Sequence, residues 1–150
     1  MPNGSIAFVD TNVLLYAQDL RDPSKQAAAA AWLAHFWRHR SGRISTQVLN
    51  ELYANLRKAA PGMTMDATRA LVRRYRAWQP WTVDDSTVDR AWAVQDRFQF
   101  NYWDALMVAA AQQQGCTVLL TEDLQHGQKI DQLQVLNPFL IGPEHLDTLP

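Results

Sequence analysis

Three aspartates occupy positions where carboxylates from separate segments of the chain could meet. Asp10 follows the apolar run Ile6–Val9, and Asp123 comes shortly after the apolar run Thr117–Leu120. Because the carboxyl ends of parallel strands lie at one edge of an open sheet, residues just past them share a crevice. Asp104 opens an apolar helical segment and reaches the same edge if that helix leads back from the crevice. Carboxylates gathered this closely resist joint ionisation, and a divalent cation would relieve that conflict.

Each acid also has a purely structural explanation. Asp104 precedes an apolar helix and could be a simple N-cap. Asp10 could equally be a cap or turn residue, and Asp123 could be a turn residue. At helical spacing, Glu51 falls opposite the apolar stripe of its own segment, and this pattern favours a solvent-exposed glutamate. Taken one at a time, these positions leave both interpretations open.

The elements that would position these acids alternate along the chain. The expected strands are Ile6–Val9, Ile44–Ser45, Trp81–Val83, Thr117–Leu120 and Leu133–Val135. A first helix is expected to begin after Asp10, and the next two cover Pro23–Arg40 and Thr46–Ala60. A fourth helix begins at Thr64 or Asp66 and ends at Trp78, and a fifth begins at Asp85 or Ser86 and ends at Phe98. The last expected helix is Asp104–Gln114. The tail from Asn137 is expected to be irregular. Strands alternating with helices predict an α/β fold with a mostly parallel sheet.

Length and composition favour one soluble domain spanning residues 1–150. The chain has 150 residues, 47% of them hydrophobic, and a formal charge of −1, which argues against a polybasic nucleic-acid or membrane binder. Cys116 is the single cysteine, so an intrachain disulfide is excluded. Met1–Gly4 carries no basic stretch typical of a signal peptide, and the longest apolar run, Ala27–Ala34, is too short to span a membrane. We therefore expect a cytoplasmic protein that does not bind membranes.

Taken together in order, four segments resemble a known family. They are Phe8–Asn12 (FVDTN), Ser45–Glu51 (STQVLNE), Tyr102–Leu106 (YWDAL) and Leu120–Gly127 (LTEDLQHG). These segments look like the acidic motifs of the PIN domain, and their order and spacing resemble the VapC group of bacterial toxin–antitoxin ribonucleases. The resemblance runs from about Ile6 to Phe139. It implies a three-layer α/β/α sandwich with a short central, mostly parallel sheet.

The resemblance also implies an activity and a site. The family's acids bind Mg²⁺ or Mn²⁺ and cleave RNA, so the implied metal-binding and catalytic residues are Asp10, Glu51, Asp104 and Asp123. Asn12 and Thr121 match polar positions that line the family's site, where they would hold a water or orient a carboxylate. We expect Asp10 and Asp104 to hold the principal ion, and Glu51 and Asp123 to hold a second ion or the attacking water. The implied partners are RNA, a cognate antitoxin protein and a second copy of the chain.

One neighbouring acid leaves a choice. Glu122 stands directly before Asp123, and either carboxylate could reach the site. Asp123 matches the family motif better, so Glu122 is expected to point elsewhere, although a contribution from it stays open.

Basic residues near the implied site could contact RNA phosphates. Setting aside the four candidate acids leaves 11 of the 15 acidic residues against 14 basic ones. Arg43, Arg57 and Lys58 are the candidates nearest the implied site, where they would make binding depend on salt. An ordinary solvated helix face explains such residues equally well.

Other chemistries find less support. His35 and His39 have helical spacing but lack the glutamate of a zinc-protease motif, and Cys116 is expected to be an inert core residue. A phosphatase of the haloacid dehalogenase type would need an acid where Asn12 stands. Two alternatives to a ribonuclease remain open: a PIN module that binds RNA or protein without cleaving, and a metal-dependent phosphatase acting on small phosphoesters.

Overall fold

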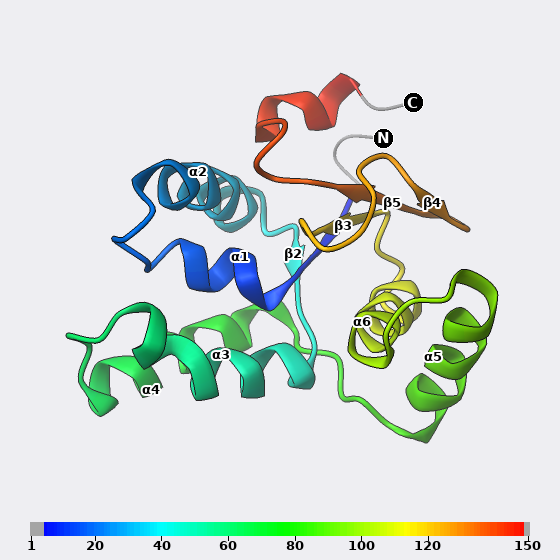
Figure 1. The fold of residues 1–150 in the computed structure, drawn as a ribbon, viewed down its shortest axis with the longest axis horizontal. Coiled ribbons are helices and arrows are strands. Elements are labelled where there is room, and N and C mark those ends of the chain that lie inside the picture. Colours follow the sequence, from blue (N-terminus) through cyan, green and yellow to red (C-terminus); the bar gives the residue numbers. More distant parts are fainter. Residues whose placement is uncertain (1–4, 149–150) are drawn as a thin grey trace.

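A five-stranded sheet organises the fold (Figure 1). The computed structural model describes residues 5–148, so the expectation for Met1–Gly4 lies outside the described residues. In spatial order the strands are β2 (Gly42–Arg43), β1 (Ala7–Val9), β3 (Val118–Leu120), β5 (Leu133–Leu136) and β4 (Lys129–Ile130). Strand β1 pairs in parallel with β2 and β3, β3 pairs in parallel with β5, and β4 runs antiparallel to β5. The predicted mostly parallel sheet is confirmed.

Helices complete a three-layer α/β/α arrangement. They are α1 (Thr11–Tyr16), α2 (Pro23–His39), α3 (Thr46–Ala59), α4 (Met65–Arg74), α5 (Asp85–Phe98) and α6 (Tyr102–Gln113), with 3₁₀ helices at Tyr75–Trp78 and Pro143–Thr148. Strand β2 lies on one side of β1, and β3 lies on the other side. The crossover from β1 to β2 and the crossover from β2 to β3 therefore run in opposite directions across the sheet. Right-handed crossovers therefore place α2 and α6 on opposite faces. Figure 1 shows α5 and α6 packed together, away from α2.

Side-chain caps set where the helices begin. Helix α2 starts with Pro23, and the Asp22 side chain accepts a hydrogen bond from the backbone N–H of Lys25 at 3.1 Å. At the start of α3, Ser45 Oγ accepts from the N–H of Val48 at 3.4 Å. Each cap satisfies a backbone donor that lacks a partner within its helix. The predicted starts of α2 at Pro23 and α3 at Thr46 are confirmed, whereas α6 begins at Tyr102, two residues before the predicted Asp104.

The central strands are buried, and their register prepares the site. Phe8 and Leu120 have no exposed surface, and apolar side chains from the helices cover both faces of the sheet. Burial of this kind stabilises a fold by roughly 25 cal/mol per Å² of apolar surface. Val9 of β1 lies directly beside Leu120 of β3. The next residue of each strand, Asp10 and Thr121, therefore emerges at the same edge of the sheet.

Two predicted strands are wrong. The chain pairs as β2 at Gly42–Arg43 rather than at Ile44–Ser45, because Ser45 already caps α3. Trp81–Val83 forms only an isolated bridge between Trp81 and Ser45. The two-residue strand β4 was not predicted, since so short an element shows no periodicity.

Close packing explains the glycine in β2. A Cβ atom at Gly42 would lie 2.6 Å from the Trp78 ring. Only glycine lets the backbone pass this close to the indole. Gly42 is therefore a contact residue of the core.

The C-terminal segment is more regular than predicted. Pro143–Thr148 forms a 3₁₀ helix within a tail that was expected to be irregular. The indole N–H of Trp32 donates to the carbonyl oxygens of Pro138 and Ile141, each at 3.1 Å, and thereby ties this segment to α2. Throughout residues 5–148, every helix is too short or too polar to cross a membrane.

Candidate active site

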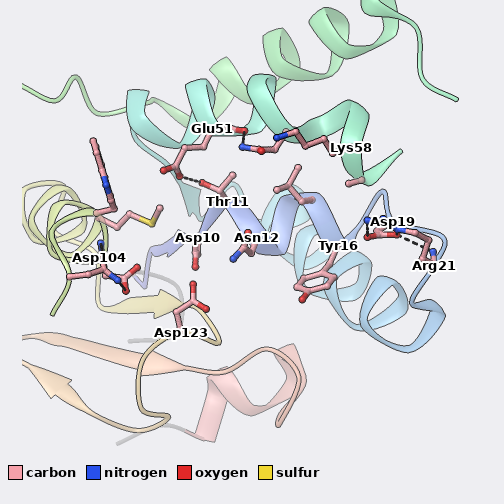
Figure 2. Close-up of a pocket in the computed structure, with 16 residues that line it drawn as sticks. Asp10, Thr11, Asn12, Tyr16, Asp19, Arg21, Glu51, Lys58, Asp104 and Asp123 are labelled. Carbon is pink, nitrogen blue, oxygen red and sulfur yellow. Dashed lines mark hydrogen bonds and ion pairs between the residues drawn. The ribbon is translucent and has the colours of Figure 1, made fainter. Parts of the chain in front are cut away.

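A cavity of about 600 Å³ opens at the carboxyl edge of β1 and β3 (Figure 2). Its lining includes the predicted site residues Asp10, Asn12, Glu51, Asp104 and Asp123. These residues come from the end of β1, from α1, α3 and α6, and from the loop after β3. The fold therefore brings together four acidic residues that are spread along the sequence from Asp10 to Asp123.

Asp10 is the most buried of the four acids, with 4% of its surface exposed. Its backbone N–H donates to the carbonyl oxygen of Leu120 at 3.1 Å, which continues the pairing of β1 with β3. Asp10 precedes α1, yet its side chain makes no capping hydrogen bond. It accepts instead from Thr121 Oγ1 at 2.8 Å. The cap interpretation of this side chain is wrong, and Figure 2 shows Asp10 and Asp123 pointing toward one another.

Thr121 connects the two strand ends. Its hydroxyl donates to Asp10 Oδ2 at 2.8 Å and accepts from the backbone N–H of Asp123 at 3.1 Å. Thr121 is itself buried. This hydroxyl holds the Asp10 carboxylate in place and also shapes the turn that presents Asp123. An orienting role for Thr121 in the reaction stays a prediction.

Glu122 points away from the cavity. Its carboxylate forms an ion pair with Lys25 Nζ at 2.8 Å. Lys25 also lies over the rings of Tyr16 and Phe139, at 4.7 and 4.9 Å from their centroids. The pair anchors the loop after β3 to α2, so Glu122 helps place Asp123 without lining the cavity.

Glu51 is half-buried, so the expectation of a solvated surface side chain is wrong. Thr11 Oγ1 donates to Glu51 Oε1 at 2.6 Å, and Gln47 Nε2 donates to Glu51 Oε2 at 3.2 Å. Helix α1 packs against α3 and covers the polar side of that helix. Both carboxylate oxygens of Glu51 are thus held in place at the cavity wall.

Asp104 lies in the first turn of α6. The N-cap of α6 is Asn101, whose Oδ1 accepts from the backbone N–H of Asp104 at 2.9 Å. Asn101 Nδ2 donates to Asp104 Oδ2 at 2.8 Å. The N-cap interpretation of Asp104 is therefore wrong. Because Asn101 takes that role, the Asp104 carboxylate is available to the cavity.

Burial and the neighbouring carboxylates disfavour the charged forms of Asp10 and Asp104. Burial is the main cause that raises the pKa of Asp10 from 3.8 to about 7, and the charges of Asp123 and Asp104 add to it. The Thr121 hydrogen bond lowers the pKa of Asp10 and offsets part of this effect. Burial, followed by the charges of Asp123 and Glu51, also raises the pKa of Asp104.

Cations in the lining only partly offset this negative charge. Arg21 lies at the cavity but is paired with Asp19 at 2.8 Å. Lys58 also lines the cavity, and its contact with a phosphate stays a prediction. Arg57 points to Met65 Sδ at 2.9 Å, and Arg43 donates to backbone carbonyls, so neither belongs to this lining.

The donor set suits a hard divalent cation. The lining offers carboxylate and amide oxygens, the ligands that Mg²⁺ and Mn²⁺ prefer. A cation would also relieve the repulsion that raises the pKa of Asp10 and Asp104. Among residues 5–148, no three acidic, histidine or cysteine side chains already form a cluster that could hold an ion.

Sequence reasoning missed three residues that orient the acids. Thr11 and Gln47 hold Glu51, and Asn101 holds Asp104. Asn101 could have been found, since an asparagine just before an apolar helix is a common N-cap signal. Thr11 and Gln47 carried no comparable signal because their role depends on how α1 packs against α3.

A mostly parallel sheet with acids gathered at its carboxyl edge defines an α/β protein with an acidic site. Residues 7–130 match the family model of the PIN domain. The chain belongs to the PIN-domain family. Membership of this family implies nuclease activity. PIN-domain nucleases generally use divalent metal ions.

Solved structures share the fold at low sequence identity. A chain of a toxin–antitoxin complex from Klebsiella pneumoniae has a TM-score of 0.61 and 19% identity, covering 88% of this chain and 97% of that one. A chain of VapBC2 from Rickettsia felis, bound to a promoter DNA fragment, has a TM-score of 0.56 and 15% identity, covering 87% and 96%. Mycobacterium tuberculosis VapC20, a toxin that cleaves the sarcin–ricin loop, has a TM-score of 0.56 and 19% identity, covering 75% and 86%. Comparison with curated protein sequences yields no significant match.

Proposed function

We propose that this protein is a Mg²⁺- or Mn²⁺-dependent endoribonuclease and the toxin of a toxin–antitoxin pair. The observation that carries the proposal is the gathering of Asp10, Glu51, Asp104 and Asp123 in one cavity, where burial and mutual repulsion raise the pKa of two of them. Such an arrangement disfavours its own charge unless a cation binds. PIN-family membership supports the hydrolysis of a phosphodiester.

The acids divide into two pairs in the proposed mechanism. Asp10 and Asp104 would hold the principal cation, and Glu51 and Asp123 would hold a second one or orient the attacking water. When bound, a divalent cation neutralises phosphate charge and makes water a better nucleophile at neutral pH. Thr121 keeps the Asp10 carboxylate directed into the cavity, while Asn12 and Lys58 line the path of the substrate. The Lys58 ammonium would contact a backbone phosphate and make binding depend on salt.

Similar structures support the proposed partners. Two of them come from toxin–antitoxin complexes, which supports a cognate antitoxin for this chain. A second copy of the chain, an RNA substrate and action in the cytoplasm belong to the same proposal, as does a single domain spanning residues 1–150. VapC20 is a toxin that cleaves the sarcin–ricin loop, which supports RNA as the substrate class here.

Cleavage of RNA by the purified protein tests the proposal. A panel of transfer, ribosomal and messenger RNAs is incubated with Mg²⁺, Mn²⁺ or EDTA, with Asp104→Asn prepared identically. We expect wild type to cut at least one RNA with either metal and none in EDTA. Asp104→Asn should lose at least about 100-fold in rate, because one carboxylate ligand is neutralised.

The same preparations separate the alternatives. Equal cleavage by wild type and Asp104→Asn would contradict the proposal, because the activity would then not depend on the candidate site. Binding of RNA without cleavage would favour a non-cleaving module. Hydrolysis of a chromogenic phosphomonoester in place of RNA would favour a phosphatase.

Removing the hydroxyl that holds Glu51 should slow cleavage without unfolding the protein. Thr11→Val keeps the shape of the buried side chain but loses the 2.6 Å hydrogen bond to Glu51. Hydrogen bonds that orient metal-binding carboxylates are worth about 10- to 100-fold, so we expect kcat to fall by about tenfold with KM little changed. Thr11→Ser restores the hydroxyl and should recover most of the rate. Similar loss in both variants would assign Thr11 a packing role alone.

A further inference from the structure

A second hollow adjoins the candidate active site. It has a volume of about 520 Å³ and is lined by Thr46, Gln47, Asn50, Val83 and Leu106 together with Glu51 and Trp103. Glu51 and Trp103 also line the cavity that holds the acids. The two hollows therefore share a wall, and a strand whose phosphate lies at the acids can extend into the second hollow.

The character of the two hollows differs. The first is lined by carboxylates and by Lys58, whose ammonium suits a phosphate. In the described lining of the second, Glu51 is the sole charged residue, and the remainder is aromatic, aliphatic, hydroxyl or amide. A nucleobase is an uncharged, flat group with polar edges, and it fits such a lining better than a phosphate does.

Trp103 provides an unusual exposed surface at this boundary. Trp103 has 60% of its surface exposed and lies directly before Asp104 in the first turn of α6. Large aromatic side chains usually pack in a core or a contact surface. An exposed aromatic beside an RNA-cleaving site offers a face on which an unpaired base can stack.

Gln47 ties the second hollow to the acids and keeps one buried acceptor without a partner. Gln47 Nε2 donates to Glu51 Oε2 at 3.2 Å and to the Trp103 carbonyl oxygen at 3.3 Å. Gln47 is only 9% exposed, and its Oε1 atom is buried and accepts no hydrogen bond. An unsatisfied buried acceptor costs free energy. Gln47 lines the second hollow, where the exocyclic amino group of a base would donate to this oxygen once the amide turns toward the hollow.

We propose that this hollow is a nucleobase subsite, in which a base beside the scissile phosphate stacks on Trp103 and presents its polar edge to Gln47 and Asn50. The inference rests on the proposed function, since it presumes an RNA strand at the acids. It assigns recognition of single-stranded RNA to the face of α3 and α6 next to the cavity. The subsite binds an unstacked base, so it favours loops and single strands over RNA helices.

Binding of a short RNA tests the subsite separately from cleavage. The probe is a fluorescein-labelled, mixed-sequence single-stranded RNA of about 12 nucleotides, measured by anisotropy with Ca²⁺ replacing Mg²⁺. We expect Trp103→Ala to weaken binding by about tenfold or more, a typical effect of losing one stacked base. Trp103→Phe keeps an aromatic face and should stay within about threefold of wild type. Because Trp103 is exposed, both variants should melt at the wild-type temperature.

Two controls separate stacking from general effects. Trp92→Ala removes another exposed tryptophan, with 55% of its surface exposed, that lines neither hollow, and it should bind like wild type. A probe with the same sugar–phosphate backbone but without bases should bind wild type and Trp103→Ala equally. Equal loss in Trp103→Ala and Trp92→Ala, equal loss on the abasic probe, or no RNA binding by wild type would overturn the subsite.

Parallel cleavage assays with Mg²⁺ distinguish failure of the subsite from failure of the proposed function. If wild type cleaves RNA while Trp103→Ala binds the probe as tightly as wild type, the subsite is wrong and the nuclease stands. If wild type binds RNA through Trp103 but cleaves none of the RNAs offered, the subsite stands and the nuclease proposal is wrong.

Discussion

Asp10→Asn is expected to abolish RNA cleavage while making the metal-free protein more stable. The substitution removes a carboxylate from the most buried position of the candidate site, where the pKa is raised to about 7. Losing a principal metal ligand should lower the rate by about 1000-fold or more, equivalent to about 4 kcal/mol of transition-state stabilisation. Asparagine can still accept the hydrogen bond from Thr121. The fold therefore loses a buried charge without losing its contact.

The gain in stability depends on pH in a defined direction. In the unfolded chain an aspartate has a pKa near 3.8, whereas folding raises the pKa of Asp10 to about 7. Between these values the folded state binds more protons, so the free energy of unfolding falls as pH rises from about 4 to about 7. Above that range Asp10 is charged in both states, and the free energy of unfolding falls no further. At pH 8 in EDTA, the free energy of unfolding of Asp10→Asn should then exceed that of wild type by about 2–4 kcal/mol.

Urea denaturation at pH 5 and pH 8, with EDTA present, measures this difference. Wild type should be less stable at pH 8 than at pH 5, and Asp10→Asn should show a smaller change. A residual slope is expected, because the pKa of Asp104 is raised as well. Asp89→Asn is a matched control, since Asp89 is exposed on α5 and loses the same charge. Wild-type cleavage by Asp10→Asn, or the same pH dependence as wild type, would contradict the assignment of Asp10.

Strand-end reasoning predicted the part of the site that depends on the sheet. Asp10 and Asp123 each follow a buried strand that is readable in the sequence, and parallel pairing of β1 with β3 brings them to one edge. Asp104 followed from the start of α6, although Asn101 takes the capping role. These positions depend on local pattern and on a general property of parallel sheets, both of which one sequence carries.

Glu51 illustrates what local pattern cannot reveal. Its helical spacing is that of a surface residue, and that spacing predicted solvent exposure. Burial comes instead from α1, a helix of six residues that packs against α3 and brings Thr11 to the carboxylate. Only the resemblance to PIN-domain motifs singled out Glu51 before the structure. Tertiary packing also explains why β2 ends before Ile44, because Ser45 already serves as the N-cap of α3.

Divalent cations are expected to stabilise the protein strongly at pH 8 and weakly at pH 5. A ligand that binds only the folded state adds about 2.7 kcal/mol when present at 100 times its Kd, and this corresponds to a rise of roughly 5–10 °C in Tm for a chain of this size. Carboxylates must be deprotonated to bind a cation, so protons compete with it wherever a carboxylate is protonated. Asp10, with a pKa of about 7, is largely protonated at pH 5.

Thermal melts with Mg²⁺, Mn²⁺ or EDTA at both pH values measure this competition without any RNA. Asp104→Asn should lose most of the metal-dependent rise, whereas Asp89→Asn should keep it. An equal rise at pH 5 and pH 8, or a rise that survives in Asp104→Asn, would place the bound cation elsewhere on the protein. A cation that binds through Asp10 and Asp104 must displace the protons that burial and repulsion favour on these carboxyl groups. Metal affinity should therefore rise with pH, while the free energy of unfolding of the metal-free protein falls.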